Sequence, residues 1–268
     1  MQLKDQVTFP NLGNKGRLGN QLFQIAATIS TAIDNDLSYA FPDWKYNEFL
    51  KNKIPEYSKL APIISYKPTH FYTEPSFRYN AINLSESVEV SLCMPKCYAL
   101  EGYFQSRKYF ENHEDFIREL FQPSQSVVNR IYSKYYRSSM SYVDCAIHVR
   151  RGDYVDLAYY HQIKMDYYEA SMLKINQQTG ITNFIIFSDD IEWCKENFTN
   201  KSYTYVFIEG NSDWDDLMFM SCFSHQIIAN SSFSWWGAFL NKNPNKIVIF
   251  PEKWFGEVAN LDATDLYY

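Results

Sequence analysis

Helical and extended patterns of apolar residues alternate along the chain, and the first lies near the amino terminus. Between Asn20 and Ile33 apolar residues recur at helical spacing, which predicts one helix. The stretch from Leu37 to Phe41 has the character of a short strand that Pro42 stops. Residues 43–95 are rich in Pro, Tyr and Ser and poorly periodic, so we expect short elements and loops there.

The second half of the chain is more regular. Short apolar segments rich in β-branched and aromatic residues recur there, separated by longer polar or helical stretches. The predicted strands are YVDCAIHV (142–149), NFIIF (183–187), TYVFI (204–208), QIIA (226–229) and KIVIF (246–250).

Three helices are predicted between these strands. Asp166 and Glu169 form a capping-box pattern that opens the first helix, and Gly180 stops it. Ser212 caps the second helix, and residues 230–232 lead into the third. Short apolar strands that alternate with helices indicate a parallel sheet covered on both faces.

Polar clusters lie where several of these strands end. Arg150 and Arg151 follow one strand, Asp189 and Asp190 follow another, and the Asn-Ser-Ser at 230–232 follows a third. Ligands of parallel sheets bind beyond the carboxyl ends of the strands. We therefore expect the three clusters to form one site.

The composition narrows the classes of partner. The 268-residue chain is 46% hydrophobic, and its formal net charge is −6 with no basic tract, which argues against a nucleic-acid partner. Its five cysteines form no metal-like array, which is typical of reduced thiols in the cytoplasm. No stretch approaches the roughly 18 apolar residues of a membrane span.

The paired arginines are a local positive feature on this acidic chain. Their planar guanidinium groups suit phosphate oxygens. Because side chains alternate along a strand, Arg150 and Arg151 are expected to point apart, with His148 on the same face as Arg150. His148 would then be a hydrogen-bond donor to a bound phosphate. A structural ion pair between an arginine and Asp153, and a satisfied core histidine, are the alternatives.

Two further clusters favour an anionic ligand. Small hydroxyl residues at 231–234 precede a helix and expose backbone N–H groups, although ordinary capping with Trp235 and Trp236 in the core explains them equally well. The glycines of the segment GNKGRLG (13–19) allow close backbone approach to a ligand. This segment matches neither the dinucleotide fingerprint nor the phosphate loop of nucleotide triphosphatases.

The segment DWDD (213–216) contains the Asp-x-Asp spacing of metal-dependent sugar transferases. It also fits the first turn of a capped helix, where acidic residues favour the helix dipole. We interpret it as a helix start. No GxSxG sequence occurs, so a triad hydrolase is not indicated.

Together these clusters resemble the α-1,2-fucosyltransferases of glycosyltransferase family eleven. The matching segments occur in the family's order and span nearly the whole chain. They are GRLGNQLFQIA (16–26), HVRRGDYV (148–155), FSDD (187–190) and DWDDLMFMSCFSHQIIANSSFSWWGAFL (213–240).

The resemblance implies an α/β, GT-B-like fold of two facing Rossmann-like domains with parallel sheets. Residues 1–125 would form the acceptor-side domain and residues 126–268 the GDP-fucose-binding domain. The implied reaction is inverting transfer of L-fucose from GDP-β-L-fucose to the 2-hydroxyl of a terminal β-galactose on an oligosaccharide. No metal or other cofactor is implied. The implied location is the cytoplasm, with peripheral association at the inner face of the membrane left open.

The resemblance also implies roles for individual residues. Arg150 would grip the diphosphate, with His148 near the nucleotide, while Asp153 either orients the arginines or accepts the proton of the acceptor. Asp189 or Asp190 would read guanine. The remaining residues implied in donor binding are Asn20, Gln21, Arg151, Asn230, Ser231, Ser232, Phe233 and Ser234.

Two other functions compete with this interpretation. A glycan-binding module would show exposed aromatic residues without a diphosphate grip. A nucleotide-sugar epimerase or dehydrogenase would need a dinucleotide fingerprint, which the sequence lacks. The clusters at the strand ends favour the transferase.

Overall fold

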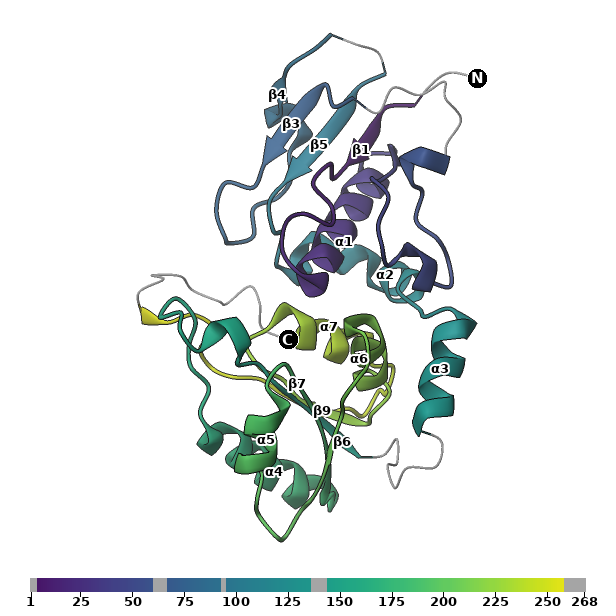
Figure 1. Ribbon diagram of the computed structural model, residues 1–268. Coiled ribbons are helices and arrows are strands. Elements are labelled where there is room, and N and C mark those ends of the chain that lie inside the picture. The colour runs from purple at the N-terminus through teal and green to yellow at the C-terminus, as the bar shows by residue number, and fades with distance from the viewer. Residues whose placement is uncertain (1–3, 60–66, 93–94, 136–143, 258–268) are drawn as a thin grey trace. The chain divides into compact units, whose positions relative to one another are not determined.

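The computed structural model describes residues 4–59, 67–92, 95–135 and 144–257. The chain divides into two compact units, Met1–Ser124 and Gln125–Tyr268. Each unit contains its own five-stranded sheet with helices packed against it (Figure 1).

The sheet of the first unit has the strand order β2-β1-β5-β3-β4. Strands β1, β2, β3 and β5 run parallel, and the edge strand β4 is antiparallel to β3. Strand β2 confirms the short strand predicted between Leu37 and Phe41. Strands β3 and β4 lie in the segment 43–95, where short elements and loops were expected, and β1 and β5 were not predicted. Strands β1, β3 and β5 pair across distant parts of the sequence, which local patterns do not reveal. The strands are β1 (Gln6–Thr8), β2 (Ser38–Tyr39), β3 (His70–Thr73), β4 (Val88–Glu89) and β5 (Cys97–Glu101).

Helix α1 (Leu18–Asp34) confirms the predicted amino-terminal helix and begins slightly earlier than expected. Most of its apolar residues, such as Leu22 and Ile29, are fully buried, whereas Ile33 near its end is exposed. The helix packs against β1 and β2. The other helices of this unit are α2 (Glu114–Leu120) and short 3-10 turns at Asn47–Phe49, Tyr57–Lys59, Leu84–Glu86, Arg107–Tyr109 and Glu111–His113.

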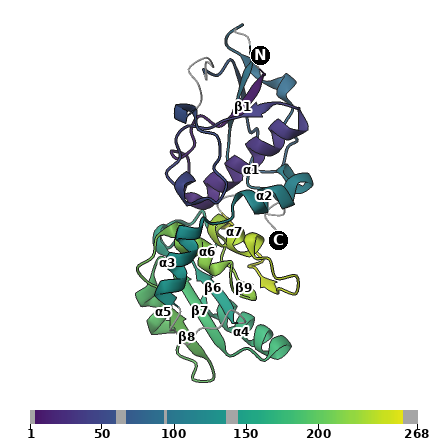
Figure 2. The ribbon, with the colours of Figure 1, turned by 90° about the vertical axis from the view of Figure 1, so that its right-hand side faces the viewer.

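The sheet of the second unit is parallel throughout, as predicted, with the order β10-β9-β6-β7-β8. Figure 2 shows these strands from a second side. The strands are β6 (Cys145–Val149), β7 (Asn183–Ser188), β8 (Thr204–Phe207), β9 (His225–Ile227) and β10 (Val248–Ile249). The helices are α3 (Gln125–Tyr135), α4 (Met165–Thr179), α5 (Ile191–Asn197), α6 (Asp213–Met220), α7 (Ser232–Leu240) and a 3-10 turn at Gly152–Tyr154.

Every residue of the central strand β6 is buried, because helices cover both faces of the sheet. On one face, alternate residues such as Ile147 pack in a core with Tyr168 of α4 and Cys194 of α5. On the other face, Phe187 contacts the ring of Phe219 in α6 at a centroid distance of 5.8 Å. Figure 1 shows α4 and α5 on one side of this sheet and α6 and α7 on the other.

The helix ends test the predicted caps. The hydroxyl of Ser212 accepts the N–H of Asp215 (3.1 Å), and that of Ser231 accepts the N–H of Phe233 (3.3 Å), so both caps are confirmed. Gly180 ends α4 in the left-handed region at φ +76°, also as predicted.

The predicted capping box at the start of α4 is wrong. The helix already begins at Met165, and its N-cap residue, Lys164, makes no side-chain capping hydrogen bond. Asp166 lies inside the first turn, where its Oδ1 accepts the N–H of Tyr167 (2.8 Å). The carboxylate therefore satisfies a backbone donor from within the helix and not from the cap position.

None of the helices in the described ranges is both long and apolar enough to cross a bilayer.

Candidate active site

The pairing of β6 with β7 brings the two charged clusters together. The strands are parallel, and Val149 lies opposite Ser188. The residues that follow each strand therefore leave the sheet side by side, which places Arg150 and Arg151 next to Asp189 and Asp190.

Arg150 is held on three sides. Its Nη2 donates to Asp153, and its Nη1 lies 2.6 Å from Oδ2 of Asp189. The guanidinium carbon lies 4.8 Å from the ring centre of Tyr154. Only 12% of the Arg150 side chain is exposed, and a guanidinium covered to this extent needs such partners.

Arg151 points to the opposite face of the sheet, as the alternation of side chains predicts. Its Nε lies 3.0 Å from Oδ2 of Asp190, and its guanidinium carbon lies 4.1 Å from the ring centre of Trp193 in α5. Its backbone N–H donates to Oδ1 of Asp189 (2.9 Å). Asp189 thus binds the side chain of one arginine and the backbone of the other.

Gly152 lets Asp189 approach the arginine loop. A Cβ atom at this position would lie 2.4 Å from Oδ2 of Asp189 and 3.1 Å from its carboxyl carbon. Any larger residue would push the carboxylate that holds Arg150.

His148 lies on the same side of β6 as Arg150 and is almost fully buried. Burial, assisted by the positive charge of Arg150 and opposed by Asp189, lowers the pKa of His148 to about 4. The imidazole is therefore neutral near pH 7 and packs 5.2 Å from the ring of Phe233. Within the part of the chain that the structure describes, its Nδ1 has no hydrogen-bond partner. A buried imidazole nitrogen without a partner is suited to a ligand atom.

The amino end of α7 lies beyond β9. Ser231 caps it, and its first turn, which contains Ser232 and Phe233, offers the backbone N–H groups that favour anions. The hydroxyl of Ser234 is fully buried and donates to the carbonyls of Ala229 and Ser231 (3.3 and 3.2 Å). The Ser234 side chain therefore stabilises the turn that leads into α7.

Asn230 also has a structural contact. Its Nδ2 donates to the carbonyls of His161 (2.9 Å) and Trp254 (2.8 Å). The amide joins the loop after β6 to the segment after β10. A role of this side chain in binding phosphate stays a prediction.

The predicted residues of the first unit lie at the start of α1. The side chain of Gln21 is buried, donates to the carbonyl of Gly16 (2.9 Å) and accepts from the indole of Trp44 (2.8 Å). Oδ1 of Asn20 accepts from Gln105 (2.5 Å). Gly16 has φ +78°, and a Cβ there would lie 2.4 Å from Asn20, so this glycine permits the tight loop.

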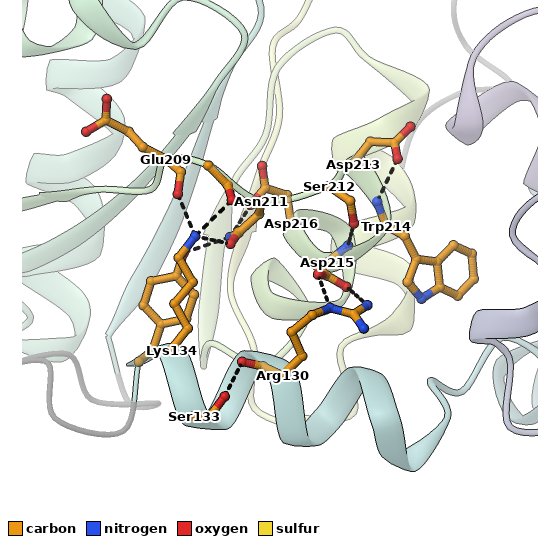
Figure 3. A network of polar contacts seen from close by, with 12 residues as sticks. Arg130, Ser133, Lys134, Glu209, Asn211, Ser212, Asp213, Trp214, Asp215 and Asp216 are labelled. Atoms are coloured by element: carbon orange, nitrogen blue, oxygen red, sulfur yellow. Dashed lines mark hydrogen bonds and ion pairs between the residues drawn. The ribbon is translucent and has the colours of Figure 1, made fainter.

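The acidic DWDD segment forms the first turn of α6, as interpreted from the sequence. Both carboxylate oxygens of Asp215 lie 2.6 Å from the guanidinium of Arg130 in α3. Oδ1 of Asp216 accepts from Asn211 (2.7 Å), whose Oδ1 accepts from Lys134 (2.5 Å). Figure 3 shows this network, in which these acidic side chains join α6 to α3.

Two aromatic residues that contact the arginines, Tyr154 and Trp193, were not predicted as site residues. Tyr154 lies within the segment HVRRGDYV, so its position was a usable signal. Trp193 reaches Arg151 because α5 packs against β7, the neighbour of β6 in the sheet, which no local pattern reveals.

The chain is similar to known glycosyltransferases in sequence and in fold. In Escherichia coli, the O-antigen biosynthesis glycosyltransferase WbnK is 36% identical over 59% of this chain and 55% of its own length. The alpha-1,2-colitosyltransferase of Escherichia coli is 31% identical over 93% of both chains. The solved structure of POFUT1 in complex with GDP-fucose superposes with a TM-score of 0.63 at 12% identity, over 92% of this chain and 98% of that one. The fold is thus GT-B-like. The model of Glycosyl transferase family 11 matches residues 2–258, and the chain belongs to this family.

Proposed function

We propose that the protein transfers L-fucose from GDP-β-L-fucose to the 2-hydroxyl of a terminal β-galactose, with inversion at the anomeric carbon. The observation that carries the proposal is the positioned guanidinium of Arg150 beside the buried Nδ1 of His148, which has no hydrogen-bond partner among the described residues. A planar fork and a neutral hydrogen-bonding imidazole suit a diphosphate that leaves as the sugar–oxygen bond breaks.

Each residue has a distinct task in this mechanism. Arg150 neutralises the charge that develops on the leaving diphosphate, and the first turn of α7 adds backbone N–H groups. Asp189 orients Arg150, and Asp190 with Trp193 holds Arg151. Recognition of guanine by Asp189 or Asp190 stays a prediction, because the structure occupies both carboxylates with arginines.

The two units take different substrates in this proposal. Unit Gln125–Tyr268 carries the arginine loop and α7, so we assign the donor to it. The acceptor is assigned to the first unit as a whole, and contact of Asn20 and Gln21 with the donor stays a prediction. The acceptor is a galactose-terminated oligosaccharide, and the cytoplasmic location stays a prediction.

We further propose that transfer needs no metal ion. Metal-dependent transferases would use the Asp-x-Asp carboxylates to bind a cation with the diphosphate. Here Asp215 is bound at both oxygens by Arg130, and Asp216 accepts from Asn211. In this proposal the arginine-based site supplies the positive charge that a metal ion would otherwise bring to the diphosphate.

The test is a panel of donors with lactose and N-acetyllactosamine as acceptors, followed by linkage analysis of the product. We expect GDP-fucose to be used and an α-1,2 product to form. GDP-colitose, whose sugar lacks the 3-hydroxyl of fucose, tests whether this protein transfers the sugar for which the colitosyltransferase of Escherichia coli is named. Exclusive use of GDP-colitose would change the transferred sugar in the proposal from fucose to colitose. Turnover with UDP-galactose alone would refute the proposal.

Replacement of the central arginine tests the site. We expect Arg150→Ala to lower kcat roughly 10²–10³-fold, the usual loss for one preorganised donor at a developing charge. Arg150→Lys should also be poor, because an ammonium cannot form the bidentate fork. Near wild-type kcat in the folded alanine variant would show that Arg150 is structural.

A further inference from the structure

Aromatic rings stack behind the face of Arg150. The guanidinium lies over Tyr154, and the ring of Tyr154 lies parallel to that of Tyr160 at a centroid distance of 3.7 Å and an angle of 2°. Tyr160 in turn stacks on Phe255 at 6.5 Å and 26°. We call Tyr154, Tyr160 and Phe255 the aromatic column. Its three rings come from two distant parts of the sequence.

The backbone holds the far end of the column in place. Tyr160 and Phe255 form an antiparallel bridge, flanked by hydrogen bonds from Gly256 N–H to Tyr159 O (2.8 Å) and from His161 N–H to Trp254 O (3.3 Å). A Cβ on Gly256 would lie 2.1 Å from the carbonyl oxygen of Ala158, so the two segments pack closely.

Two amides fasten the same loop from other sides. Nε2 of Gln162 donates to the carbonyl of Tyr154 (2.5 Å), and Nδ2 of Asn230 donates to the carbonyls of His161 and Trp254. The loop that carries Tyr154 and Tyr160 is thus tied to β9 and to the segment after β10. These hydrogen bonds hold in place the two backbone segments from which the three rings extend.

We propose that the aromatic column is a positioning device that fixes the plane of the Arg150 guanidinium for the diphosphate. This inference rests on the proposed function. Asp153 and Asp189 contact the edges of the guanidinium through Nη2 and Nη1, but contacts at two edges still allow the plane to tilt. A ring against one face prevents the tilt, and Tyr154 can serve only if Tyr160 and Phe255 hold it from behind. The column residues act through Arg150 and touch no substrate.

The experiment compares variants that keep or remove one ring in the middle of the column. Tyr160→Leu removes the stacking surface, and Tyr160→Phe keeps it. Leu157→Ala, whose exposed side chain lies in the same loop, is the matched control. We measure GDP affinity by calorimetry together with kcat. We expect Tyr160→Leu to weaken GDP binding roughly 3- to 30-fold, the range of an arginine–aromatic contact, with a fall in kcat. Tyr160→Phe and Leu157→Ala should stay within about twofold of wild type.

A second measurement separates positioning from general stability. Tyr160→Leu is introduced into Arg150→Lys, which keeps the charge but has no planar group to hold. If the column acts through Arg150, the added loss of GDP affinity in this background is less than about twofold. An equal loss in both backgrounds, or a loss equally large in Leu157→Ala or Tyr160→Phe, would overturn the proposal. Failure of the wild-type protein to bind GDP would instead refute the proposed function, and the column's role with it.

Discussion

The two carboxylates beside Arg150 differ in how firmly they are held. Asp189 also accepts the backbone N–H of Arg151, and 26% of its side chain is exposed. Asp153 lies on the 3-10 turn after the arginines, and 47% of its side chain is exposed. In the proposed mechanism we therefore expect the phosphate of a bound donor to displace the more exposed Asp153 from Arg150 before it displaces Asp189.

Replacement of Asp153 distinguishes an orienting carboxylate from a general base. Since Asp153 forms an ion pair with Arg150, we expect Asp153→Asn to weaken GDP binding, with the pH profile of kcat unchanged in shape. Calorimetric GDP binding and a kcat–pH profile on this variant are the measurements. A base would give the reverse pattern, with intact GDP affinity, kcat lower by roughly 10²–10⁴ and a lost acidic limb.

Gly152 gives a test of Asp189 that leaves the carboxylate in place. In Gly152→Ala the new methyl group would meet Oδ2 of Asp189, so the carboxylate must move away from Arg150. We expect kcat/KM to fall roughly 10- to 100-fold, as small misplacements at reacting groups do, with little change in Tm. The check is steady-state kinetics in the wild-type and Asp189→Ala backgrounds. A loss that persists undiminished without the Asp189 carboxylate would contradict this account.

Helix α6 carries a carboxyl group with an unusual pKa. Burial raises the pKa of Asp216 from 3.8 to about 6, and Asp213 and Asp215 add to the shift, whereas Asn211 and Lys134 oppose it. The folded state therefore binds this proton more tightly than the unfolded state. The resulting stability is present below about pH 4 and is lost as the pH rises through about 6.

Removal of this charge should flatten the pH dependence of stability. We expect Asp216→Asn to reduce the loss of unfolding free energy between pH 4 and pH 7 by about 2–3 kcal/mol, from about 1.4 kcal/mol per pKa unit. Denaturant unfolding at several pH values measures it. Glu196→Gln, which removes an exposed carboxylate on α5, is the control and should keep the wild-type pH dependence. Identical pH curves for Asp216→Asn and wild type would show that Asp216 ionises normally.

The strands and helix starts of the second unit could be predicted because each is marked by residues close together in the sequence. The apolar run of Cys145–Val149 marks a strand buried on both faces, and Ser212 and Ser231 mark helix starts by their own side chains. The same patterns missed β3 and β5, whose pairing joins residues distant in sequence. The partners of the arginines were missed for a related reason.

The neighbours of Arg150 depend on which strands lie side by side. The sequence places Asp189 and Asp190 at a strand end, yet only the pairing of β6 with β7 brings them to the arginines. Tyr160 and Phe255 likewise meet through a bridge between distant segments. The residue types of the site could thus be predicted, whereas their mutual contacts required the tertiary structure.

The whole chain combines a net charge of −6 with a local cluster of arginines. A diphosphate donor needs positive charge at one place only, and in the proposed mechanism fixed guanidinium and backbone N–H groups supply that charge. The acidic residues with metal-like spacing are used elsewhere in the same unit, since Asp215 joins α6 to α3 through Arg130.

Removal of metal ions with EDTA tests whether transfer requires a metal ion at the acidic residues. Because arginine and helix N–H groups stabilise the leaving diphosphate in the proposed mechanism, we expect EDTA to leave the rate within about twofold of the untreated enzyme. The rate is measured with EDTA and again after Mg²⁺ or Mn²⁺ is added back in excess. Asp215→Asn is the companion variant. It should lower stability, because Arg130 loses its charged partner, while the folded fraction keeps its kcat and its indifference to metal. Activity that strictly requires added metal and is lost in Asp215→Asn would contradict this account. It would assign the DWDD carboxylates to the diphosphate and overturn the metal-independent mechanism.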